Sequence, residues 1–299
     1  MRDISLDGVK LDGDLGIRVR EASEYMSIPG TNNQIVKIPG KHGSQFLDSD
    51  LDPRPFAFDC RTRSKSFSNL QKTVRDLTTI FFDQFGKAKE VKLVLGHEPE
   101  KWYNVRYAGS VSIQKLAKFG DFILPLIAYD PYAYAPATYY DPDFIARYDT
   151  DTYYDDGITE YTNQTHTPFN NPRQYAGVFN YSHYATPFSF VIEGYVHKPK
   201  ITNLTSGQST RINVTVQEGE RLYFDSKLKT TWKVKAEDDE WFWLTPYQKM
   251  KDYAYWDKVN QYNDMTGNFI ELLSGGNSLL FEGGNPNAQI NFNWEHRYL

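Results

Sequence analysis

The residues with the clearest potential for catalysis are two glutamates, Glu98 and Glu100, which flank Pro99 in the stretch HEPEKWY. Paired carboxylates can cleave glycosidic bonds when one protonates the leaving group and the other attacks or activates water. That chemistry needs two groups facing each other across a cleft, about 5 to 10 Å apart. Two acids within one short hairpin are more often turn residues, so this pair does not predict a hydrolase.

The acidic stretch DTDTYYDDGITE, residues 149–160, has the length of a calcium-binding loop and acids at its first, third and twelfth positions. The fifth position, which should supply a ligand, is Tyr153, and the sixth, which should be glycine, is Tyr154. No helical pattern flanks the stretch. We therefore expect a solvated acidic loop without a bound metal.

Histidine and cysteine suggest no further site. The six histidines lack the spacing of zinc ligands; they are His42, His97, His166, His183, His197 and His296. The single cysteine, Cys60, lies in the alternating run PFAFDCR, where it should face the core with Phe56 and Phe58. Nucleophile elbows, phosphate-binding loops and dinucleotide-binding glycine patterns do not occur. The sequence predicts a protein that is not an enzyme and has no catalytic residue, metal or cofactor.

Aromatic side chains support one alternative, a carbohydrate site. Jelly-roll sandwiches often bind sugars by stacking aromatic rings, and four tryptophans cluster in the C-terminal part of the chain: Trp232, Trp241, Trp243 and Trp256. Trp241 and Trp243 are two residues apart in WFWL and point to one face of a strand, which can equally be the core face. Contact of these residues with sugar or with a partner protein remains an alternative.

Length and composition limit the classes of protein to which the chain can belong. A chain of 299 residues favours two domains, each with its own core, and the 16% share of aromatic residues favours β-structure. The formal net charge of −5 disfavours general binding to nucleic acid phosphates. The N-terminus has no apolar run of signal-peptide length, and no segment approaches the ~18 apolar residues of a membrane span. We expect a protein made in the cytoplasm that does not insert into membranes.

The first part of the chain consists of short strand-like runs and one helical pattern. In SFSNLQKTVRDLTTIFFDQFG, apolar residues recur at steps of three and four, which predicts an amphipathic helix over residues 68–85. Ser68 and Gln71 fit a capping box, and Gly86 fits the left-handed position after the last turn. The apolar stripe consists of Phe67, Leu70, Val74, Leu77 and Phe81. We predict a domain over residues 1–134 in which this helix packs on a mostly antiparallel sheet.

Residues 135–174 have no sustained period and are rich in Pro, Asp, Asn and Thr, which predicts a connector or extended arm. Twelve of the 22 tyrosines fall between Tyr129 and Tyr184. Because tyrosine buries a large ring while its hydroxyl stays hydrogen-bonded, we expect the connector to lie against protein, either its own domains or a neighbouring copy. The candidate docking residues are Tyr139, Tyr140, Tyr153 and Tyr154.

Residues 175–299 return to short strands separated by turn signals. The strand-like runs include TRINVTV, RLYFD, TWKVKA, SLLFEGG and QINFNWEHRYL, and the turns between runs include EGE, EDDE, SGGN and GGNPN. Many short strands without a convincing helix predict a second, all-β domain, a sandwich of the jelly-roll kind.

Six stretches follow one another in a recognisable order: IPGKHGSQF, RPFAFDCR, NLQKTVRDLTTIFF, VKLVLGHEPEKWYNVRYAGSVSI, FGDFILPLIAYDPYAYA and ATPFSFVIEGYVHKPKITNLTSG. Together they resemble the distal tail protein family of long-tailed, non-contractile bacteriophages, over nearly the whole chain. The most specific parts are the run from the helix to Asp130-Pro131-Tyr132, and the entry into the second domain with Pro187, Ile192 and Gly194.

This resemblance implies a structural virion protein of mainly β fold. Its N-terminal β-sandwich, with the single helix, would form a hexameric ring beneath the tail tube. Its C-terminal, galectin-like β-sandwich would hold receptor-binding or other baseplate proteins. The implied partners are further copies of the chain, the tail tube protein and the tail-associated lysin or tail fibre hub protein, and DNA would pass through the ring without specific binding. Asp130-Pro131 would end the last strand of the ring domain, because Pro cannot continue a ladder.

Three functions are therefore compared. The first is a ring-forming adaptor of the phage tail tip, made in the host bacterial cytoplasm. The second is a carbohydrate-binding module that contributes directly to attachment to the host cell wall. The third, a tail-associated wall hydrolase, is disfavoured by the lack of a cleft-like acid pair or metal set. A glycan-binding assay on residues 175–299 separates the first two.

Overall fold

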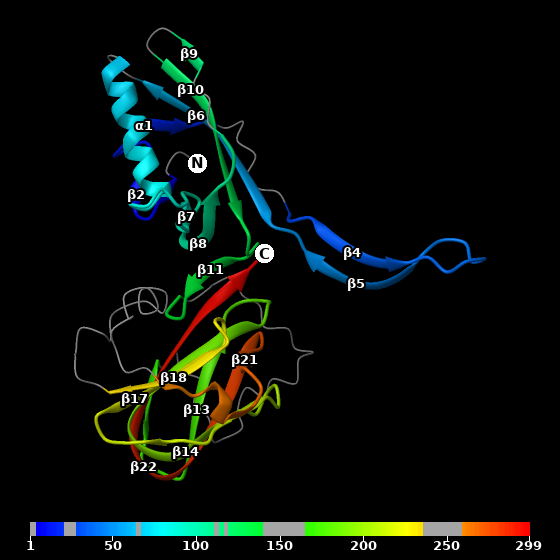
Figure 1. Ribbon diagram of the computed structural model, residues 1–299, viewed down its shortest axis with the longest axis vertical. Coiled ribbons are helices and arrows are strands. Elements are labelled where there is room, and N and C mark those ends of the chain that lie inside the picture. The colour runs from blue at the N-terminus through cyan, green and yellow to red at the C-terminus, as the bar shows by residue number, and fades with distance from the viewer. Residues whose placement is uncertain are drawn as a thin grey trace. The chain divides into compact units, whose positions relative to one another are not determined.

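The computed structural model describes residues 4–20, 28–63, 67–110, 114–116, 119–139, 165–235 and 259–299. Over these residues the chain is mainly β with one α-helix, as the sequence predicts. The chain divides into two compact units, the first formed by Met1–Ala135 with Tyr298–Leu299 and the second by Pro136–Arg297 (Figure 1). None of the helices in the described part of the chain is long and apolar enough to cross a membrane.

The first unit combines antiparallel strands with the helix. Its elements are β1 (Ser5–Leu6), β2 (Val9–Lys10), β3 (Ile17–Val19), β4 (Thr31–Val36), β5 (Gln45–Leu51), β6 (Arg54–Arg63), α1 (Phe67–Phe81), β7 (Val91–Leu95), β8 (Glu98–Tyr107), β9 (Gln114–Leu116), β10 (Phe119–Ala128) and β11 (Ala133–Pro136). The longest ladder joins β6 to β10 over ten residue pairs, and β3 pairs with the other edge of β6. Strands β1 and β8 flank β7.

The core of this unit follows the predicted alternation along β6. Phe56, Phe58 and Cys60 are buried on one face of the strand, as expected from the PFAFDCR pattern. The ring of Phe56 lies 5.1 Å from that of Tyr103 on β8, measured between ring centroids, in an edge-to-face arrangement. The apolar faces of β6 and β8 therefore pack against each other.

Helix α1 covers the sheet of the first unit (Figure 1) and buries Leu77, Ile80 and Phe81 in its core. The helix ends at Phe81, so the predicted end at residue 85 is wrong. The side chain of Asp83 closes a turn there, because its Oδ1 accepts hydrogen bonds from the backbone N–H groups of Phe85 and Lys87, both at 2.9 Å. Gly86, at φ 72°, belongs to this turn and does not cap the helix.

The chain does not leave the sheet at Asp130-Pro131, in contrast to the prediction. Strand β11 follows directly and pairs with β8, with Tyr134 opposite Trp102. The buried Tyr134 hydroxyl donates a hydrogen bond to the Asp130 side chain. Proline interrupts the ladder, but the chain returns to the sheet as β11, and Tyr134 lies in the first unit, within the predicted domain of residues 1–134.

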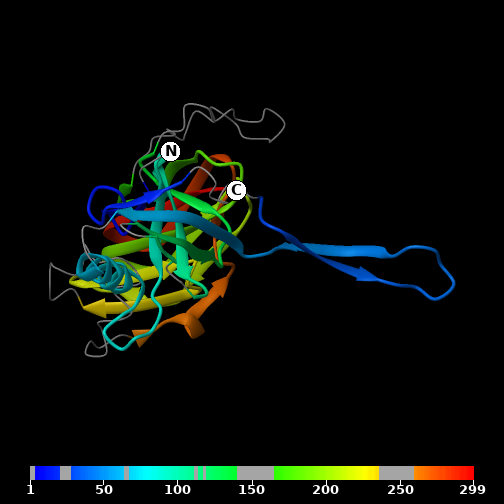
Figure 2. The ribbon, with the colours of Figure 1, turned by 90° about the horizontal axis from the view of Figure 1, so that it is seen from above.

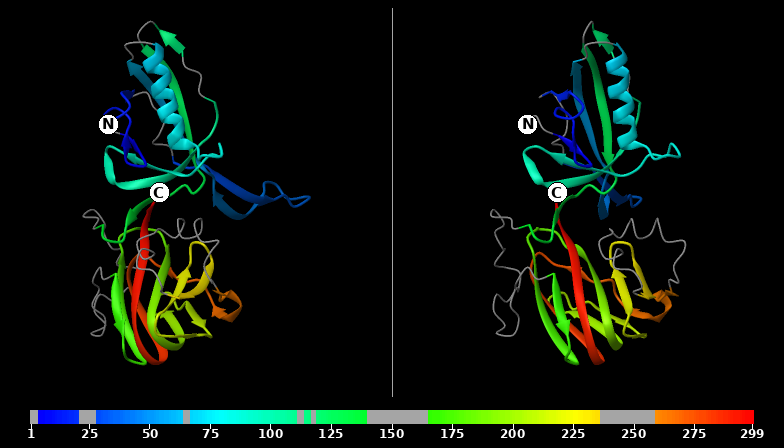
Figure 3. Two further views of the ribbon diagram at one scale, coloured as in Figure 1. Left: turned by 60° about the vertical axis from the view of Figure 1, so that its left-hand side comes forward. Right: turned by 90° about the vertical axis from the view of Figure 1, so that its left-hand side faces the viewer.

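The second unit is built around two long strands. Its elements are β12 (His166–Phe169), β13 (Arg173–Asn180), β14 (Thr186–Asn203), β15 (Ser209–Ile212), β16 (Thr215–Val216), β17 (Glu220–Asp225), β18 (Thr230–Lys235), β19 (Val259–Asn260), η2 (Tyr262–Asp264), β20 (Met265–Gly267), β21 (Glu271–Leu272) and β22 (Gly275–Tyr298). Strands β14 and β22 run side by side (Figure 3) and carry much of the buried apolar core.

The GGNPN stretch at residues 283–287 lies inside β22, so the turn predicted there is wrong. Instead β14 and β22 bend together at shifts in their register. Gly194 permits a close approach, because a Cβ at this position would lie 2.6 Å from the backbone oxygen of Asn287. Asn285, at φ 46°, has the left-handed backbone of a turn residue although the pairing continues. Glycine and asparagine here produce a bend in a continuous ladder.

The predicted connector also contains regular structure at its C-terminal end. Strand β12 pairs with β22 from His166 opposite Asn291 to Phe169 opposite Ala288. Residues 165–174 thus contribute to the sheet of the second unit, which corrects the expectation of an irregular segment up to residue 174. In the sequence, a proline within a short run suggests that a strand ends there, but Pro168 is compatible with an edge strand.

Candidate interface: an exposed hairpin arm

Strands β4 and β5 form a separate two-stranded sheet that extends away from the other strands of the first unit (Figure 2). The pairing runs from Thr31 opposite Leu51 to Val36 opposite Gln45. Every side chain of the two strands is exposed except that of Leu51, which is half-buried. We call residues 28–51 the arm.

The arm exposes apolar side chains that a solvated loop would not need. Six of them are Ile28, Ile35, Val36, Ile38, Phe46 and Leu47. Ile35 and Phe46 are cross-strand partners, and their sequence neighbours Val36 and Leu47 are also apolar. Ile35 and Val36 are successive residues of β4 and point to opposite faces, so each face of the distal half of the arm carries an apolar side chain, and Leu47 lies at a shift in the register. Exposed apolar side chains gathered on one hairpin are typical of an interaction surface.

Stability leads to the same interpretation. Two polar side-chain pairs link the strands toward the base of the arm: Ser49 Oγ donates to Asn33 Oδ1 at 2.8 Å and Gln34 Nε2 donates to Asp50 Oδ2 at 3.4 Å. A two-stranded hairpin without further packing is only marginally stable in water. The distal apolar half therefore gains most if another protein surface covers it. These features make the arm a candidate interface.

The arm itself was missed in the sequence prediction. Its strands carry neither a clean apolar alternation nor a two-residue turn signal. The reversal uses an eight-residue connection between Val36 and Gln45, with the backbone N–H of Lys41 bonded to the Ile38 oxygen at 3.1 Å and Gly40 at φ 81°. The useful signal was the pair of apolar clusters on either side of the PGKHG stretch, which no core-facing pattern explains.

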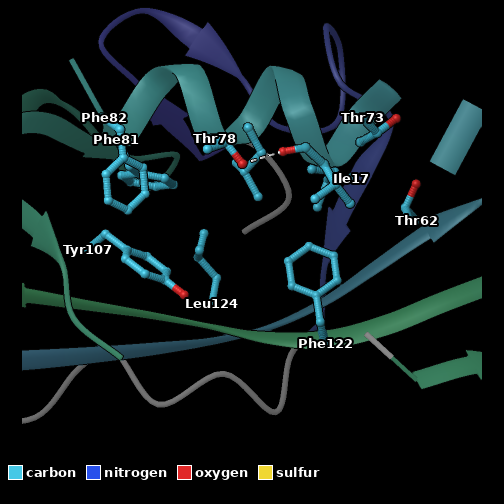
Figure 4. A pocket seen from close by; sticks show the side chains of 11 residues that line it. Ile17, Thr62, Thr73, Thr78, Phe81, Phe82, Tyr107, Phe122 and Leu124 are labelled. Carbon is cyan, nitrogen blue, oxygen red and sulfur yellow. Dashed lines mark hydrogen bonds between the residues drawn. The ribbon is translucent and has the colours of Figure 1, made fainter. Parts of the chain in front are cut away.

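A pocket of about 180 Å³ lies between α1 and the sheet of the first unit (Figure 4). Its lining is almost entirely apolar: Ile17, Thr62, Thr73, Val74, Leu77, Thr78, Phe81, Phe82, Tyr107, Phe122 and Leu124. The Thr78 hydroxyl is bonded to the Val74 carbonyl within the helix, at 2.8 Å. The described lining residues include no carboxylate, imidazole or amine.

The predicted aromatic site is described in the structure at one residue only. Trp232 lies on β18 and is half-buried, with its ring 6.2 Å from that of Tyr223, between centroids. It joins a small cluster with Tyr223 and Val234. Trp241, Trp243 and Trp256 lie outside the described residues. Sugar or partner contact by these residues stays a prediction, which glycan binding by the full chain tests.

The predicted docking tyrosines are described at one position. Tyr139 is half-buried, and its backbone N–H bonds to the Pro136 oxygen at 2.8 Å. Tyr140, Tyr153 and Tyr154 lie outside the described residues, as does the acidic stretch at 149–160. Docking of the connector stays a prediction.

The candidate acids do not face each other across a cleft. Glu98 and Glu100 lie two residues apart on β8, and Glu98 pairs with Lys101 at 3.3 Å. No three histidine, cysteine, aspartate or glutamate side chains of the described chain lie close enough to hold a metal. Burial raises the pKa of the Cys60 thiol to about 12, so it is protonated near neutral pH and a poor nucleophile.

Comparison with known proteins identifies the matching families and folds. Residues 16–128 match the family model of the phage tail protein RIFT-related domain. The crystal structure of the SPP1 Dit protein, described as a paradigm of the hub adsorption apparatus in phages that infect Gram-positive bacteria, shares the fold over 100% of both chains, with 12% identity and a TM-score of 0.62. Two structures of the activated phage P2 baseplate, with calcium and with strontium, align over 100% of this chain and 99% of theirs, at 10% identity and a TM-score of 0.49. No curated protein sequence matches. The family match and the fold shared with SPP1 Dit confirm the resemblance to distal tail proteins.

Proposed function

We propose that this chain is a structural protein of a bacteriophage tail tip, a baseplate hub that forms a hexameric ring between the tail tube and the host-adhesion device. The observation that carries the proposal is the exposed apolar arm, because it belongs to the same unit as the segment that matches a phage tail protein family. The SPP1 Dit fold supports this assignment at the level of architecture.

In this proposal the arm of each copy lies on a neighbouring copy. The apolar patch of the arm and the surface that receives it are different parts of the molecule, so the contact is heterologous, and a heterologous contact closes into a ring when its rotation permits. Fully burying a Phe, Leu or Ile side chain contributes about 1.5–3 kcal/mol. Phe46 is 60% exposed in the single chain, so covering it adds roughly 1–2 kcal/mol.

The charge of the chain suits a ring through which DNA passes. Lysine and arginine contacts to phosphates bind DNA and release counterions. A protein with a formal net charge of −5 provides little general attraction of this kind. We propose that DNA passes without specific binding, and that the second unit holds receptor-binding or other baseplate proteins.

The proposal is tested by weakening the arm without disturbing the fold. Replacing Phe46 with Ser removes an exposed apolar ring, so the thermal stability of the single chain should change little. Self-association should weaken, which sedimentation velocity over a range of protein concentrations measures. The control is Leu204→Ser, an exposed apolar residue of the second unit outside the arm.

The expected result is a loss of the large species in Phe46→Ser and its retention in Leu204→Ser. If both variants associate as strongly as the parent, the arm is not part of the interface. A parent chain that stays monomeric at every concentration would contradict the ring itself, unless a tail partner is needed to nucleate it.

A further inference from the structure

Four charged residues form one row across the sheet of the second unit. Arg173 on β13 lies opposite Glu282 on β22, Glu282 lies opposite Lys200 on β14, and Lys200 lies opposite Arg211 on β15. Directly opposite residues share one face of a sheet. Neighbouring strands are about 4.8 Å apart, so the row spans about 14 Å. The alternate positions Ile201 and Phe281 are fully buried, which places the charged row on the outer face.

The row borders a hollow of about 340 Å³. Its lining includes His197, Lys198, Lys200, Arg211, Glu282 and Gly284. It lies where β14 bulges, because β14 advances three residues from His197 to Lys200 while β22 advances two from Gly284 to Glu282. A bulge of this kind re-aims side chains.

The backbone at the bulge is held in an uncommon conformation. Lys198 has φ 47°, a left-handed value that lysine rarely adopts. Its N–H is bonded to the oxygen of Val214 at 2.9 Å, which fixes the conformation. Opposite His197, Gly284 leaves room for the ring, since a Cβ there would lie 3.2 Å from the His197 Cβ. The hollow therefore has a fixed backbone frame.

The charges around the hollow do not balance. Glu282 pairs with both Arg173, at 3.5 Å, and Lys200, at 3.2 Å. Within the part of the chain that the structure describes, no ion pair joins Arg211 or Lys198 to an acid. The lining of the hollow thus carries three lysine or arginine side chains, Lys198, Lys200 and Arg211, and one carboxylate, in a protein whose formal net charge is −5. Like charges on neighbouring strands repel one another, and an anion in the hollow would relieve this repulsion.

We propose that this hollow binds phosphate groups, with Lys200 and Arg211 as the principal contacts and Lys198 at the rim. A phosphate carries the charge and the acceptor oxygens that arginine and lysine recognise best, and arginine can bind it through two parallel hydrogen bonds. Glu282 opposes the anion, because its carboxylate repels the phosphate and competes with it for Lys200. The site lies in the second unit and does not involve the arm, so the test of phosphate binding does not depend on whether the ring forms.

The test is isothermal titration calorimetry of the full chain at low ionic strength. Three probes distinguish the sources of phosphate: inorganic tripolyphosphate, glycerol 1-phosphate and a single-stranded oligonucleotide. Arg211→Gln and Lys200→Gln should each weaken tripolyphosphate binding about tenfold, as removal of a charge-assisted hydrogen bond does. Glu282→Gln should strengthen it, which a merely structural role of this residue would not produce. The control is Lys227→Gln, an exposed lysine of the same unit that pairs with Glu295 at 3.4 Å.

Binding of glycerol 1-phosphate with the same sensitivity to Arg211→Gln would assign the site to phosphates on polyols. Binding of the oligonucleotide with that sensitivity would assign it to nucleic acid backbones. The proposal is overturned if no probe binds, if Lys227→Gln loses as much affinity as Arg211→Gln, or if Glu282→Gln weakens binding while the chain stays folded by circular dichroism.

Discussion

Replacing Leu77 with Asp tests how α1 holds the first unit together. Leu77 is 8% exposed and packs in the core beside Ile80 and Phe81. The change removes a buried apolar side chain and introduces a carboxylate in apolar surroundings. Both effects destabilise the folded unit.

The magnitude follows from this environment. Losing the buried leucine side chain costs about 2–3 kcal/mol, and an unpaired carboxylate adds several more. The pocket of about 180 Å³ beside Leu77 lets the new side chain move toward open space, which reduces the second cost. We expect a total of about 3–5 kcal/mol. For a domain with a stability of about 5–15 kcal/mol, this lowers the melting temperature by roughly 10 °C or more.

Calorimetry of the full chain measures the change, with Lys72→Asp as the matched control. Lys72 is exposed on the same helix, so the same new residue should alter stability there by no more than about 0.5 kcal/mol. The part of the Leu77→Asp penalty that comes from the buried charge should also shrink as the pH falls from neutral and be absent below about pH 4, where the carboxyl is protonated in the unfolded chain as well. If Leu77→Asp melts like the parent while Lys72→Asp loses its stability, the buried face of α1 is assigned wrongly.

Two further predictions concern the cores of the two units. Gly194→Ala should lower the free energy of unfolding in urea by about 3 kcal/mol or more, because Gly194 is at φ 106° and the new Cβ would lie 2.6 Å from the Asn287 backbone oxygen. The control Gly207→Ala, at φ 73° with nothing within 4 Å, should lower it by only about 1–2 kcal/mol. Equal losses would contradict the close approach of β14 and β22. The buried Cys60 thiol should resist a thiol reagent at pH 8 until the chain is unfolded. Since burial raises its pKa from 9.0 to about 12, its contribution to stability should be complete below pH 9 and be lost as the pH rises toward 12. Between pH 9 and pH 12, the free energy of unfolding of Cys60→Ala should therefore fall less than that of the parent. An equal fall in both proteins would contradict this prediction.

Elements with a repeating apolar pattern were predictable from the sequence. The alternation in PFAFDCR correctly placed Phe56, Phe58 and Cys60 on the buried face of β6. The three- and four-residue steps in the helical segment correctly indicated α1 and the burial of Leu77. Such patterns succeed because one face of each element is removed from water by the core.

The errors arose where local residue preferences and tertiary contacts disagree. The GGNPN stretch has the composition of a turn, but pairing with β14 keeps it in a strand. Just beyond the end of α1, the Asp83 side chain accepts hydrogen bonds from the backbone N–H groups of Phe85 and Lys87 and closes a turn, which apolar periodicity does not record. These features depend on a single side chain or on a partner strand far away in the sequence.

The candidate interface was the hardest part to predict. The arm has no core-facing stripe, since its apolar residues are exposed in the single chain. A pattern that reports burial within one chain cannot identify a surface that another chain would cover. The charged row from Arg173 to Arg211 was equally hidden, because its members come from four strands and meet only through their register.

The central claim, that this chain assembles into a hexameric ring, is tested most directly by native mass spectrometry of the full-length parent chain together with class averages from negative-stain images. We expect a species of six times the 34.7 kDa chain mass and rings with sixfold symmetry, in reversible exchange with smaller oligomers. A chain that remains monomeric at every concentration, with no ring in the images even after the tail tube protein is added, would contradict the claim.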